Sequence, residues 1–434
     1  MKLSIEKMIY GGDGLAHMPA DASGRGKTAF VPFVLPGEEI EAALTEDKPG
    51  FIRARAETIL TPSQQRTEAP CPYFVSCGGC HYQHTSYGNQ LQIKSQILRE
   101  TLLRIAKIDW KNELEVHASE PWNYRNRTRM KMQHSPFGIG YYRFNSHELL
   151  PVEQCPISSP LINHAVAVIW KIGQTAGAIA DSIAEVEFFA DADDQKLLIE
   201  IYLSGKGKPS DLESSAAAFF QTLAPELPQL AGVAAFFQGP AIVSSFGYEG
   251  ADSLQYRTSI SELRVSAGSF FQVNRFLIEE LVATATSDAK GKLAWDLYAG
   301  VGLFSAALAK NSERVVAVES SPASSDDLAH NAPRNTKAVQ STTERFLEQS
   351  SGRAKSSSPD FVLVDPPRAG LGQKVATKLA NSMAGQISYV SCDPATLARD
   401  LRVLLDAGYK LDGLHLFDLF PQTFHIETIA RLSR

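Results

Sequence analysis

Five cysteines are the residues whose type and spacing point most directly to chemistry. They are Cys71, Cys77, Cys80, Cys155 and Cys392. A clustered triplet with one remote partner is the sequence pattern of a site with four thiolate ligands, and Gly78 and Gly79 let the backbone bend close to a metal. Zinc and a 4Fe-4S cluster both take four thiolates. Structural zinc usually uses two close pairs, so the spacing favours iron–sulfur and leaves zinc open.

The fifth cysteine, Cys392, lies in the segment SCDP between a predicted strand and a predicted helix. A thiolate at a helix N-terminus is stabilised by the positive end of the helix dipole, so Cys392 is a candidate nucleophile. A buried, inert thiol is the alternative.

Two carboxylates end neighbouring strands of the same predicted sheet. The segment DLYAGVG, residues 296–302, follows one strand, and Glu319 ends the next, where a carboxylate can accept both ribose hydroxyls of an adenosine ligand. A third glycine for a pyrophosphate is absent, so S-adenosylmethionine fits better than a dinucleotide. Asp365 ends the strand FVLVD, and two prolines stiffen the loop after it. A helix N-cap is an equally good interpretation of Asp365 alone.

A candidate acid/base pair lies near the C-terminal end of the sequence. His425 and Glu427 are two residues apart, a spacing that puts both on one face of a strand. A glutamate in an apolar strand has a raised pKa, which suits a base that works near neutrality. The alternative is a surface carboxylate.

The elements that position these residues divide the chain into three parts. Strands and helices alternate in residues 263–434, which predicts a buried parallel sheet with ligands at the carboxyl ends of its strands. Residues 1–62 are predicted to form short, glycine-punctuated strands, the pattern of a small β-barrel. Residues 87–107 are predicted to form a helix with Leu91, Leu98, Leu102 and Ile105 on one face and Lys94 elsewhere. The serine-rich segment 350–359 is predicted to be a flexible loop.

Four cations recur at every second position before the middle of the chain. They are Arg125, Arg127, Arg129 and Lys131. On a strand this spacing puts all four on one face, and the stretch contains no acid, so it is a candidate phosphate-contacting row. A solvated strand face is the alternative.

Composition limits the classes of protein that remain. The 434 residues carry 42 Lys+Arg and 48 Asp+Glu, a net charge of −6, which argues against electrostatic capture of nucleic acid by the whole protein but permits a local basic track. No apolar run is long enough to span a bilayer and the first residues are not a secretion signal, so we expect a cytoplasmic protein of two to four domains with no membrane contact.

Taken together, these motifs resemble the RNA uridine-5 methyltransferases, and specifically the 23S rRNA (uracil-5-)-methyltransferase branch that carries a 4Fe-4S cluster. The segments CPYFVSCGGCHYQH and EQCPI resemble the family's cluster motif. The segments FFQVN, DLYAGVGLFS, VVAVE, LVDPPRAGL, YVSCDPATLARDL and FPQTFHIE resemble its catalytic motifs, in its order. Residues 1–62 resemble its TRAM domain, an RNA-binding barrel.

The resemblance implies an α/β fold in three domains. Residues 1–62 would be an OB-like TRAM barrel, residues 63–262 a central α+β RNA-binding domain with the cluster, and residues 263–434 a Rossmann-like class I methyltransferase domain. The implied cofactors are S-adenosylmethionine and a 4Fe-4S cluster held by Cys71, Cys77, Cys80 and Cys155. The implied partner is RNA, most simply 23S rRNA, with no obligate protein partner evident.

The resemblance also assigns individual roles. Cys392 would attack uracil C6 and Glu427 would remove the C5 proton. Gln272, Tyr298, Glu319 and Asp365 would line the S-adenosylmethionine site. The sequence departs from many relatives at Ala299, where they have Cys. Two alternatives remain: the same chemistry on a tRNA uridine, and a non-catalytic RNA-binding iron–sulfur protein, against which the intact Cys392 and Glu427 argue.

Overall fold

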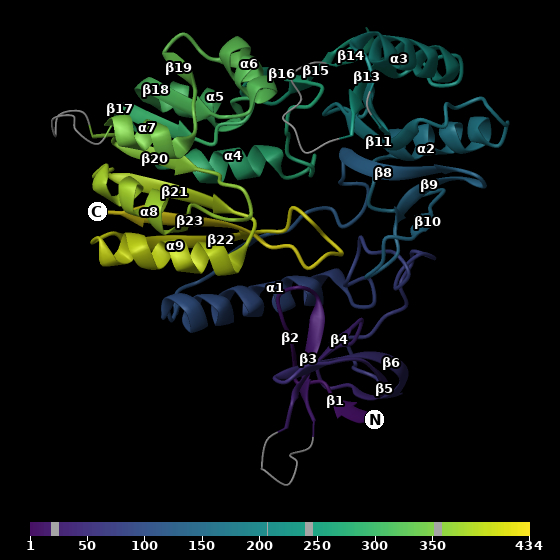
Figure 1. Cartoon of the computed structure of the whole chain (residues 1–434). Coiled ribbons are helices and arrows are strands. Elements are labelled where there is room, and N and C mark those ends of the chain that lie inside the picture. Colours follow the sequence, from purple (N-terminus) through teal and green to yellow (C-terminus); the bar gives the residue numbers. More distant parts are fainter. Residues whose placement is uncertain (19–25, 206, 239–245, 351–357) are drawn as a thin grey trace.

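The computed structural model describes residues 1–18, 26–205, 207–238, 246–350 and 358–434. Most of the serine-rich loop predicted at 350–359 therefore lies outside the described residues. Figure 1 shows three bodies: a small barrel-like sheet at the N-terminus, a central sheet with two helices, and a larger C-terminal sheet between helices. No helix of the described residues is long and apolar enough to cross a membrane.

The N-terminal body is one strongly curled sheet in the order β1-β5-β6-β4-β3-β2. The first and last strands of this order are consecutive in the chain, and the two residues between them bond to both sides: Ile5 N–H donates to Glu38 O beside β5, and Glu6 N–H donates to Leu15 O in β3. The curled sheet therefore folds back on itself as a strand-rich half-barrel around alternating apolar side chains. Its strands are β1 (Lys2–Ser4), β2 (Lys7–Met8), β3 (Asp13–His17), β4 (Thr28–Pro32), β5 (Glu39–Asp47) and β6 (Phe51–Thr61).

The central body is a seven-stranded sheet in the order β10-β9-β8-β11-β12-β13-β14, with one apolar core beneath two helices. Its pairs are antiparallel except for β12 with β13. A short hairpin, β15 (Ser253–Arg257) with β16 (Glu262–Ser266), follows it. The elements are β8 (Arg127–His134), β9 (Phe137–Tyr142), β10 (Leu149–Pro151), α2 (Pro160–Gly173), β11 (Ile183–Ala190), β12 (Leu197–Leu203), α3 (Pro209–Leu223), β13 (Leu230–Phe237) and β14 (Gly247–Gly250).

The cations on β8 are paired with acids on β11 and β12, which the sequence of their own strand does not reveal; their contact with phosphate stays a prediction. Arg127 is 9% exposed and binds Glu187 at 2.6 Å and Glu200 at 2.8 Å. The next two cations follow the same pattern: Arg129 binds Glu187 at 2.7 Å, and Lys131 binds Glu185 at 2.6 Å. Arg125, the first member of the row, lies beside the cysteines instead. The stretch that carries the four cations contains no acid of its own. The antiparallel pairing of β8 with β11 places Glu185 and Glu187 opposite Lys131 and Arg129.

The C-terminal body is an eight-stranded sheet in the order β19-β18-β17-β20-β21-β23-β22-β7. Its strands are parallel except for β23, and helices cover both faces, as the alternating pattern predicts. The strand order reverses between β17 and β20, where doubly wound sheets bind ligands. The elements are α4 (Ile278–Thr286), β17 (Gly291–Leu297), α5 (Leu303–Asn311), β18 (Ser312–Glu319), α6 (Pro322–Asn331), β19 (Thr336–Gln340), α7 (Thr343–Ser350), β20 (Phe361–Val364), α8 (Gly372–Asn381), β21 (Gln386–Ser391), α9 (Pro394–Asp406), β22 (Lys410–Phe417) and β23 (Glu427–Ser433).

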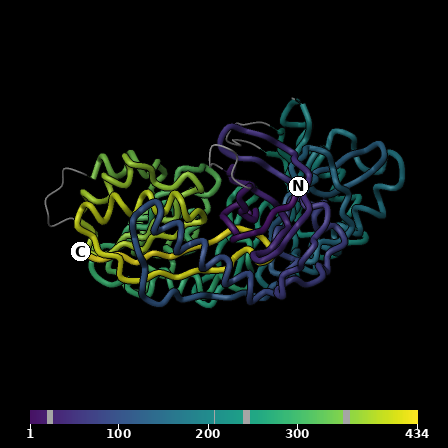
Figure 2. The backbone as a smooth tube through the Cα atoms, turned by 90° about the horizontal axis from the view of Figure 1, so that it is seen from below, coloured from purple at the N-terminus to yellow at the C-terminus, as the bar shows by residue number. Residues whose placement is uncertain are grey.

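Residues 87–117 pack on the C-terminal sheet rather than on the central one. Helix α1 (Tyr87–Thr101) and the π-helical turn after it, Leu102–Ala106, lie along α9, and β7 (Glu115–His117) joins the edge of the sheet beside β22. Figures 1 and 2 both show α1 running alongside α9. The π-helical turn shifts the helical register, so Ile105 is 37% exposed instead of buried. Lys94, expected on the polar face, is fully buried.

Candidate active site

A cavity of about 660 Å³ opens at the carboxyl ends of β17, β18, β20 and β21. Its position matches the crevice at which the strand order reverses. The structure brings together in its lining all six residues predicted for the catalytic and cofactor sites. They are Gln272, Tyr298, Glu319, Asp365, Cys392 and Glu427.

The turn after β17 is shaped for close approach of a ligand. Tyr298, Gly300 and Gly302 have φ values of +65°, +54° and +95°. A left-handed conformation in a non-glycine residue such as Tyr298 is uncommon and concentrates at functional sites. No atom lies within 4 Å of the position that a Cβ on Gly300 would take, so the backbone there faces open space in the cavity.

Glu319 is held as an acceptor at the end of β18. Its Oε2 accepts the Gly300 N–H at 2.9 Å, and its Oε1 accepts the N–H groups of Ser320 and Ser321 at 2.6 and 2.7 Å. A carboxylate offers about four acceptor positions. The three backbone donors therefore fix its orientation and leave capacity for the hydroxyl groups of a ligand.

Two buried carboxyl groups, Asp365 in the cavity lining and Asp296 in β17, have raised pKa values. Burial, together with the charge of Asp296, raises the pKa of Asp365 to about 7. Burial likewise raises the pKa of Asp296 to about 7, although its Oδ2 accepts a hydrogen bond from the Ser305 hydroxyl. Gln272 Nε2 lies 3.5 Å from Asp365 Oδ2, at the limit of a hydrogen bond.

Cys392 lies between β21 and α9, as predicted, but its thiol is not acidified. Burial raises its pKa to about 12, and the carboxyl groups of Glu427 and Asp365 add to the effect while Arg368 opposes it. The free N–H groups of α9 are taken by Asp393, whose Oδ1 accepts from Ala395 and Thr396. The helix end therefore stabilises the carboxylate of its cap, which explains the difference from the expected thiolate.

Glu427 is the first residue of β23 and is 5% exposed, so it is not a surface carboxylate. Burial and the nearby Asp365 raise its pKa well above the usual range, in the direction that its apolar strand predicts. Arg368 supplies a cation to the same wall of the cavity and lies 3.1 Å from the ring of His425. Sequence reasoning passed over Arg368, although it follows the two prolines of the Asp365 motif.

The loop between β22 and β23 carries His425 and is held by segments from elsewhere in the chain. The carbonyl of Gln422 accepts the N–H groups of His81 and Tyr82 at 2.8 and 3.0 Å. Lys94, fully buried, binds Asp418 at 2.6 Å and the Phe420 carbonyl at 3.0 Å. The residues next to the cysteine triplet and helix α1 thus fix this loop directly.

The N-terminal body also reaches Cys392. The Tyr10 hydroxyl donates a hydrogen bond to the carbonyl of Cys392 at 3.2 Å. Its ring packs edge-on against Phe424 at 5.5 Å, and Phe424 packs edge-on against His81 at 4.7 Å. No local pattern around Tyr10 points to this contact, which depends on the way the curled sheet docks.

The four remaining cysteines line a second cavity, of about 80 Å³, between the triplet loop and residue 155. All four are free thiols. Burial raises the pKa of Cys77 to about 11 and that of Cys80 to about 12, with contributions from the neighbouring cysteines. Arg125 lines the same cavity, and its buried Nε has no hydrogen-bond partner among the described residues. Four thiols beside an unsatisfied buried cation form a donor set that suits an anionic metal–thiolate group.

The sheet order, the single reversed strand and the ligand crevice define a class I S-adenosylmethionine-dependent methyltransferase fold. The family model described as tRNA (uracil-5-)-methyltransferase matches residues 86–434. The chain therefore belongs to the family of RNA (uracil-5-)-methyltransferases, enzymes that use S-adenosylmethionine, as its motifs predicted.

Relatives of known sequence and structure extend over the whole chain. An uncharacterized RNA methyltransferase of Aquifex aeolicus is 31% identical over 100% of this chain and 98% of its own length. The 23S rRNA (uracil(1939)-C(5))-methyltransferase RlmD of a Shewanella species is 32% identical over 98% of this chain and 94% of its own length. The crystal structure of Pyrococcus abyssi tRNA (uracil-54, C5)-methyltransferase with S-adenosyl-L-homocysteine matches all of both chains with a TM-score of 0.74 at 22% identity.

Proposed function

We propose that this protein methylates C5 of one uridine in 23S rRNA through a covalent Cys392–uracil adduct. The observation that carries the proposal is the presence of Cys392 and Glu427 in one cavity with the four residues expected to bind S-adenosylmethionine. A nucleophile and a buried base beside an adenosine site are the parts that methylation of an electron-poor pyrimidine carbon requires. The full-length similarity to a relative named for 23S rRNA favours that substrate.

The chemistry begins with Cys392 because uracil C5 is a poor nucleophile. The thiol passes its proton to the neighbouring Asp365 carboxylate, and its sulfur adds to C6 of the uracil, which turns C5 and O4 into an enolate. Arg368 beside the thiol favours the thiolate, and protonation of Asp365 removes one charge that opposes it, while Glu427 stays ionised. S-adenosylmethionine would supply an electrophilic methyl group: C5 bonds to the methyl carbon as the bond from that carbon to sulfur breaks, which releases S-adenosylhomocysteine.

Glu427 completes the proposed reaction. Its carboxylate accepts the proton on C5, the C5–C6 double bond reforms, and the bond from C6 to Cys392 breaks. A raised pKa makes the carboxylate a stronger base once it is ionised. Asp365, which neighbours both residues, would hold the edge of the uracil.

The target base would reach the cavity only after it is turned out of its RNA fold, so a loop or bulge is the expected setting. Phe270 lines the cavity and is 64% exposed, unusual for a large apolar side chain. An exposed aromatic ring at such a mouth can stack on a splayed base. The N-terminal half-barrel would act as the RNA-binding TRAM domain, and the central body as a second RNA-binding domain.

For the cysteine site we propose a 4Fe-4S cluster rather than zinc. Four sulfurs around one zinc ion at about 2.3 Å would lie about 3.8 Å apart. Among the residues that the structure describes, no three cysteine sulfurs lie within 4.8 Å of one another. Wider spacing and a cavity of about 80 Å³ suit a group larger than one ion. A thiolate cluster also requires the reducing environment of the cytoplasm, where we expect the enzyme to work.

The same chemistry on a tRNA uridine is the second candidate. It is favoured by the family model described as tRNA (uracil-5-)-methyltransferase, which matches residues 86–434.

The experiment that tests the proposal is mapping of 5-methyluridine in RNA from cells with and without the gene. We expect one uridine of 23S rRNA to lose its methyl group and to regain it with the wild-type gene, but not with Cys392→Ala. Loss of the modification from tRNA alone would contradict the proposed substrate. Full activity of Cys392→Ala on purified RNA would contradict the proposed nucleophile.

A further inference from the structure

A cluster of metal-ligating side chains lies at the edge of the catalytic sheet, apart from both cavities described above. Glu115 and His117 are two residues apart on β7 and project from one face of that strand. Strand β7 pairs in parallel with β22, where His415 lies opposite Glu115. One glutamate and two histidines therefore converge from two adjacent strands.

The spacing of the ligand atoms matches the edges of a coordination tetrahedron. His117 Nε2 lies 3.1 Å from His415 Nδ1, and Glu115 Oε2 lies 3.3 Å from the same nitrogen. All three atoms are within 4.8 Å of one another. Ligands at about 2.0–2.1 Å from a tetrahedral zinc ion are about 3.3–3.4 Å apart. One ion can thus contact all three atoms with small side-chain movements.

Residues next to the three candidate ligands hold the His117 ring in place. Glu280 on α4 lies 2.6 Å from His117 Nδ1, so the proton of that ring is held on Nδ1 and the lone pair of Nε2 faces the cluster. The His117 ring also stacks on Phe417 at 4.0 Å with an interplanar angle of 5°. The ring is therefore fixed from two sides in the orientation that a ligand needs.

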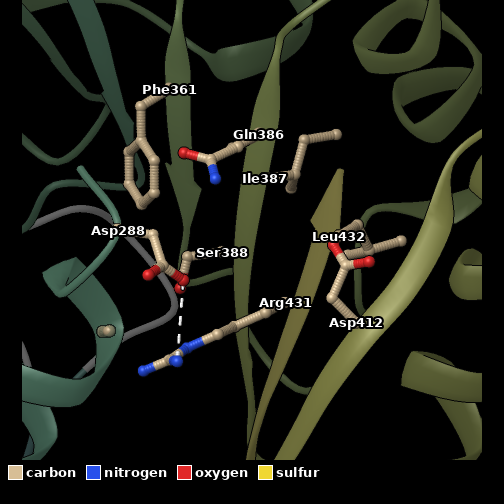
Figure 3. A pocket seen from close by; sticks show the side chains of 9 residues that line it. Asp288, Phe361, Gln386, Ile387, Ser388, Asp412, Arg431 and Leu432 are labelled. Carbon is tan, nitrogen blue, oxygen red and sulfur yellow. Dashed lines mark ion pairs between the residues drawn. The ribbon is translucent and has the colours of Figure 1, made fainter. Parts of the chain in front are cut away.

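A cation, Arg431 on β23, lies near His415. Arg431 is itself held by Asp288 at 3.6 Å and by the Thr284 carbonyl at 2.9 Å. Figure 3 shows this ion pair beside a small hollow of about 20 Å³ on the same sheet. Asp288 thus partly offsets the cation that would oppose a bound metal.

We propose that Glu115, His117 and His415 bind a divalent transition-metal ion of the zinc class, with the fourth position open to water. Two imidazoles and a carboxylate suit such an ion and suit calcium or magnesium poorly. The ion would join β7 to β22, with α4 acting through Glu280. The competing interpretation is a hydrogen-bonded chain from Glu280 through the two histidines to Glu115 without metal.

The test is cobalt binding to the full-length protein whose cysteine site is already loaded, followed by visible spectroscopy. We expect the wild type to bind one Co²⁺ more than His415→Ala, with ligand-field bands and no thiolate charge-transfer band. Equal binding by the two proteins, or a thiolate spectrum for the additional ion, would overturn the proposal.

Two further variants keep the test independent of folding. Glu280→Gln changes an exposed residue outside the coordination sphere and should weaken Co²⁺ binding about 10- to 100-fold. His17→Ala removes a histidine from an exposed pair with Glu6 and should leave binding unchanged. Unchanged affinity in Glu280→Gln, or an equal loss in His17→Ala, would show adventitious binding only.

Discussion

Replacing Tyr10 by phenylalanine removes one hydroxyl that links the N-terminal body to Cys392, the proposed nucleophile. The hydroxyl donates to the carbonyl of Cys392, and the aromatic ring packs on Phe424. Phenylalanine keeps the ring contact, so Tyr10→Phe isolates the hydrogen bond. We expect the change to lower the rate of the step in which the thiol adds to uracil, because the Cys392 peptide is less firmly held.

The magnitude follows from the geometry of this bond. A net contribution of about 0.5–1.5 kcal/mol corresponds to a factor of about 2 to 13. At 3.2 Å the bond is longer than the usual 2.7–2.8 Å for two oxygens, which places it in the lower part of this range. We therefore expect the single-turnover rate of methyl transfer to fall about two- to fivefold.

The assay is transfer of a radiolabelled methyl group to a 23S rRNA fragment with enzyme in excess. The dissociation constants for the RNA and for S-adenosylmethionine should not change, which separates positioning of the thiol from binding. Tyr248→Phe, at a 51% exposed tyrosine on β14, is the matched control and should behave as the wild type. An unchanged rate for Tyr10→Phe, or a loss confined to RNA affinity, would refute the positioning role.

Two other predictions concern the cofactor side of the cavity. Glu319→Gln should weaken binding of S-adenosylmethionine by about tenfold or more in calorimetry, because charge-assisted hydrogen bonds contribute about 1.5–3 kcal/mol. The affinity for RNA should be retained. Equal affinity of the variant and the wild type for the cofactor would contradict a role of Glu319 in the site. Asp296 is fully buried, and its pKa is about 7 in the folded state against 3.8 in the unfolded state. Its protonated form therefore stabilises the fold below about pH 4, and this contribution is lost as the pH rises through 7. This shift of about three pKa units corresponds to about 4 kcal/mol, so the melting temperature of Asp296→Asn relative to the wild type should increase from pH 5 to pH 8. A difference that stays constant with pH would contradict the raised pKa.

The shared position of four of the proposed active-site residues could be predicted from the sequence because each lies at the end of a recognisable strand. Tyr298, Glu319, Asp365 and Cys392 lie at the ends of four parallel strands that are neighbours in the sheet, whose carboxyl ends must meet at one edge. Glu427 was predicted to be a buried base from its apolar neighbours, and the structure places it in the same cavity.

The features that the sequence did not reveal depend on contacts between distant parts of the chain. The cations at Arg127, Arg129 and Lys131 meet acids supplied by β11 and β12, which no pattern within their own strand reveals. The acidified thiol was inferred from the helix dipole alone, but burial and two carboxyl groups from other strands have the larger effect on Cys392. Local periodicity predicts which face of a helix or strand is buried. The charges that this face contacts depend on which other elements pack against it in the fold.

The same reasoning applies to the helix at residues 87–101. A helix over residues 87–107 was predicted, whereas α1 ends at Thr101 and a π-helical turn continues to Ala106; the burial of Lys94 was not predicted. The partner of Lys94 is Asp418, which is equally buried and lies more than 300 residues away in the chain. This pair ties the helix to the loop that precedes Glu427, so a helix assigned by sequence to the central domain contributes to the catalytic one.

The most direct test of the proposed mechanism is a search for the covalent intermediate on a denaturing gel. Glu427→Gln enzyme, incubated with the 23S rRNA fragment and S-adenosylmethionine, should accumulate a slowly migrating protein–RNA adduct that resists denaturation, because methylated uracil cannot lose its C5 proton. The adduct should be absent from the double variant Cys392→Ala, Glu427→Gln. Failure to form the adduct in Glu427→Gln, or its persistence in the double variant, would contradict the assigned roles of base and nucleophile.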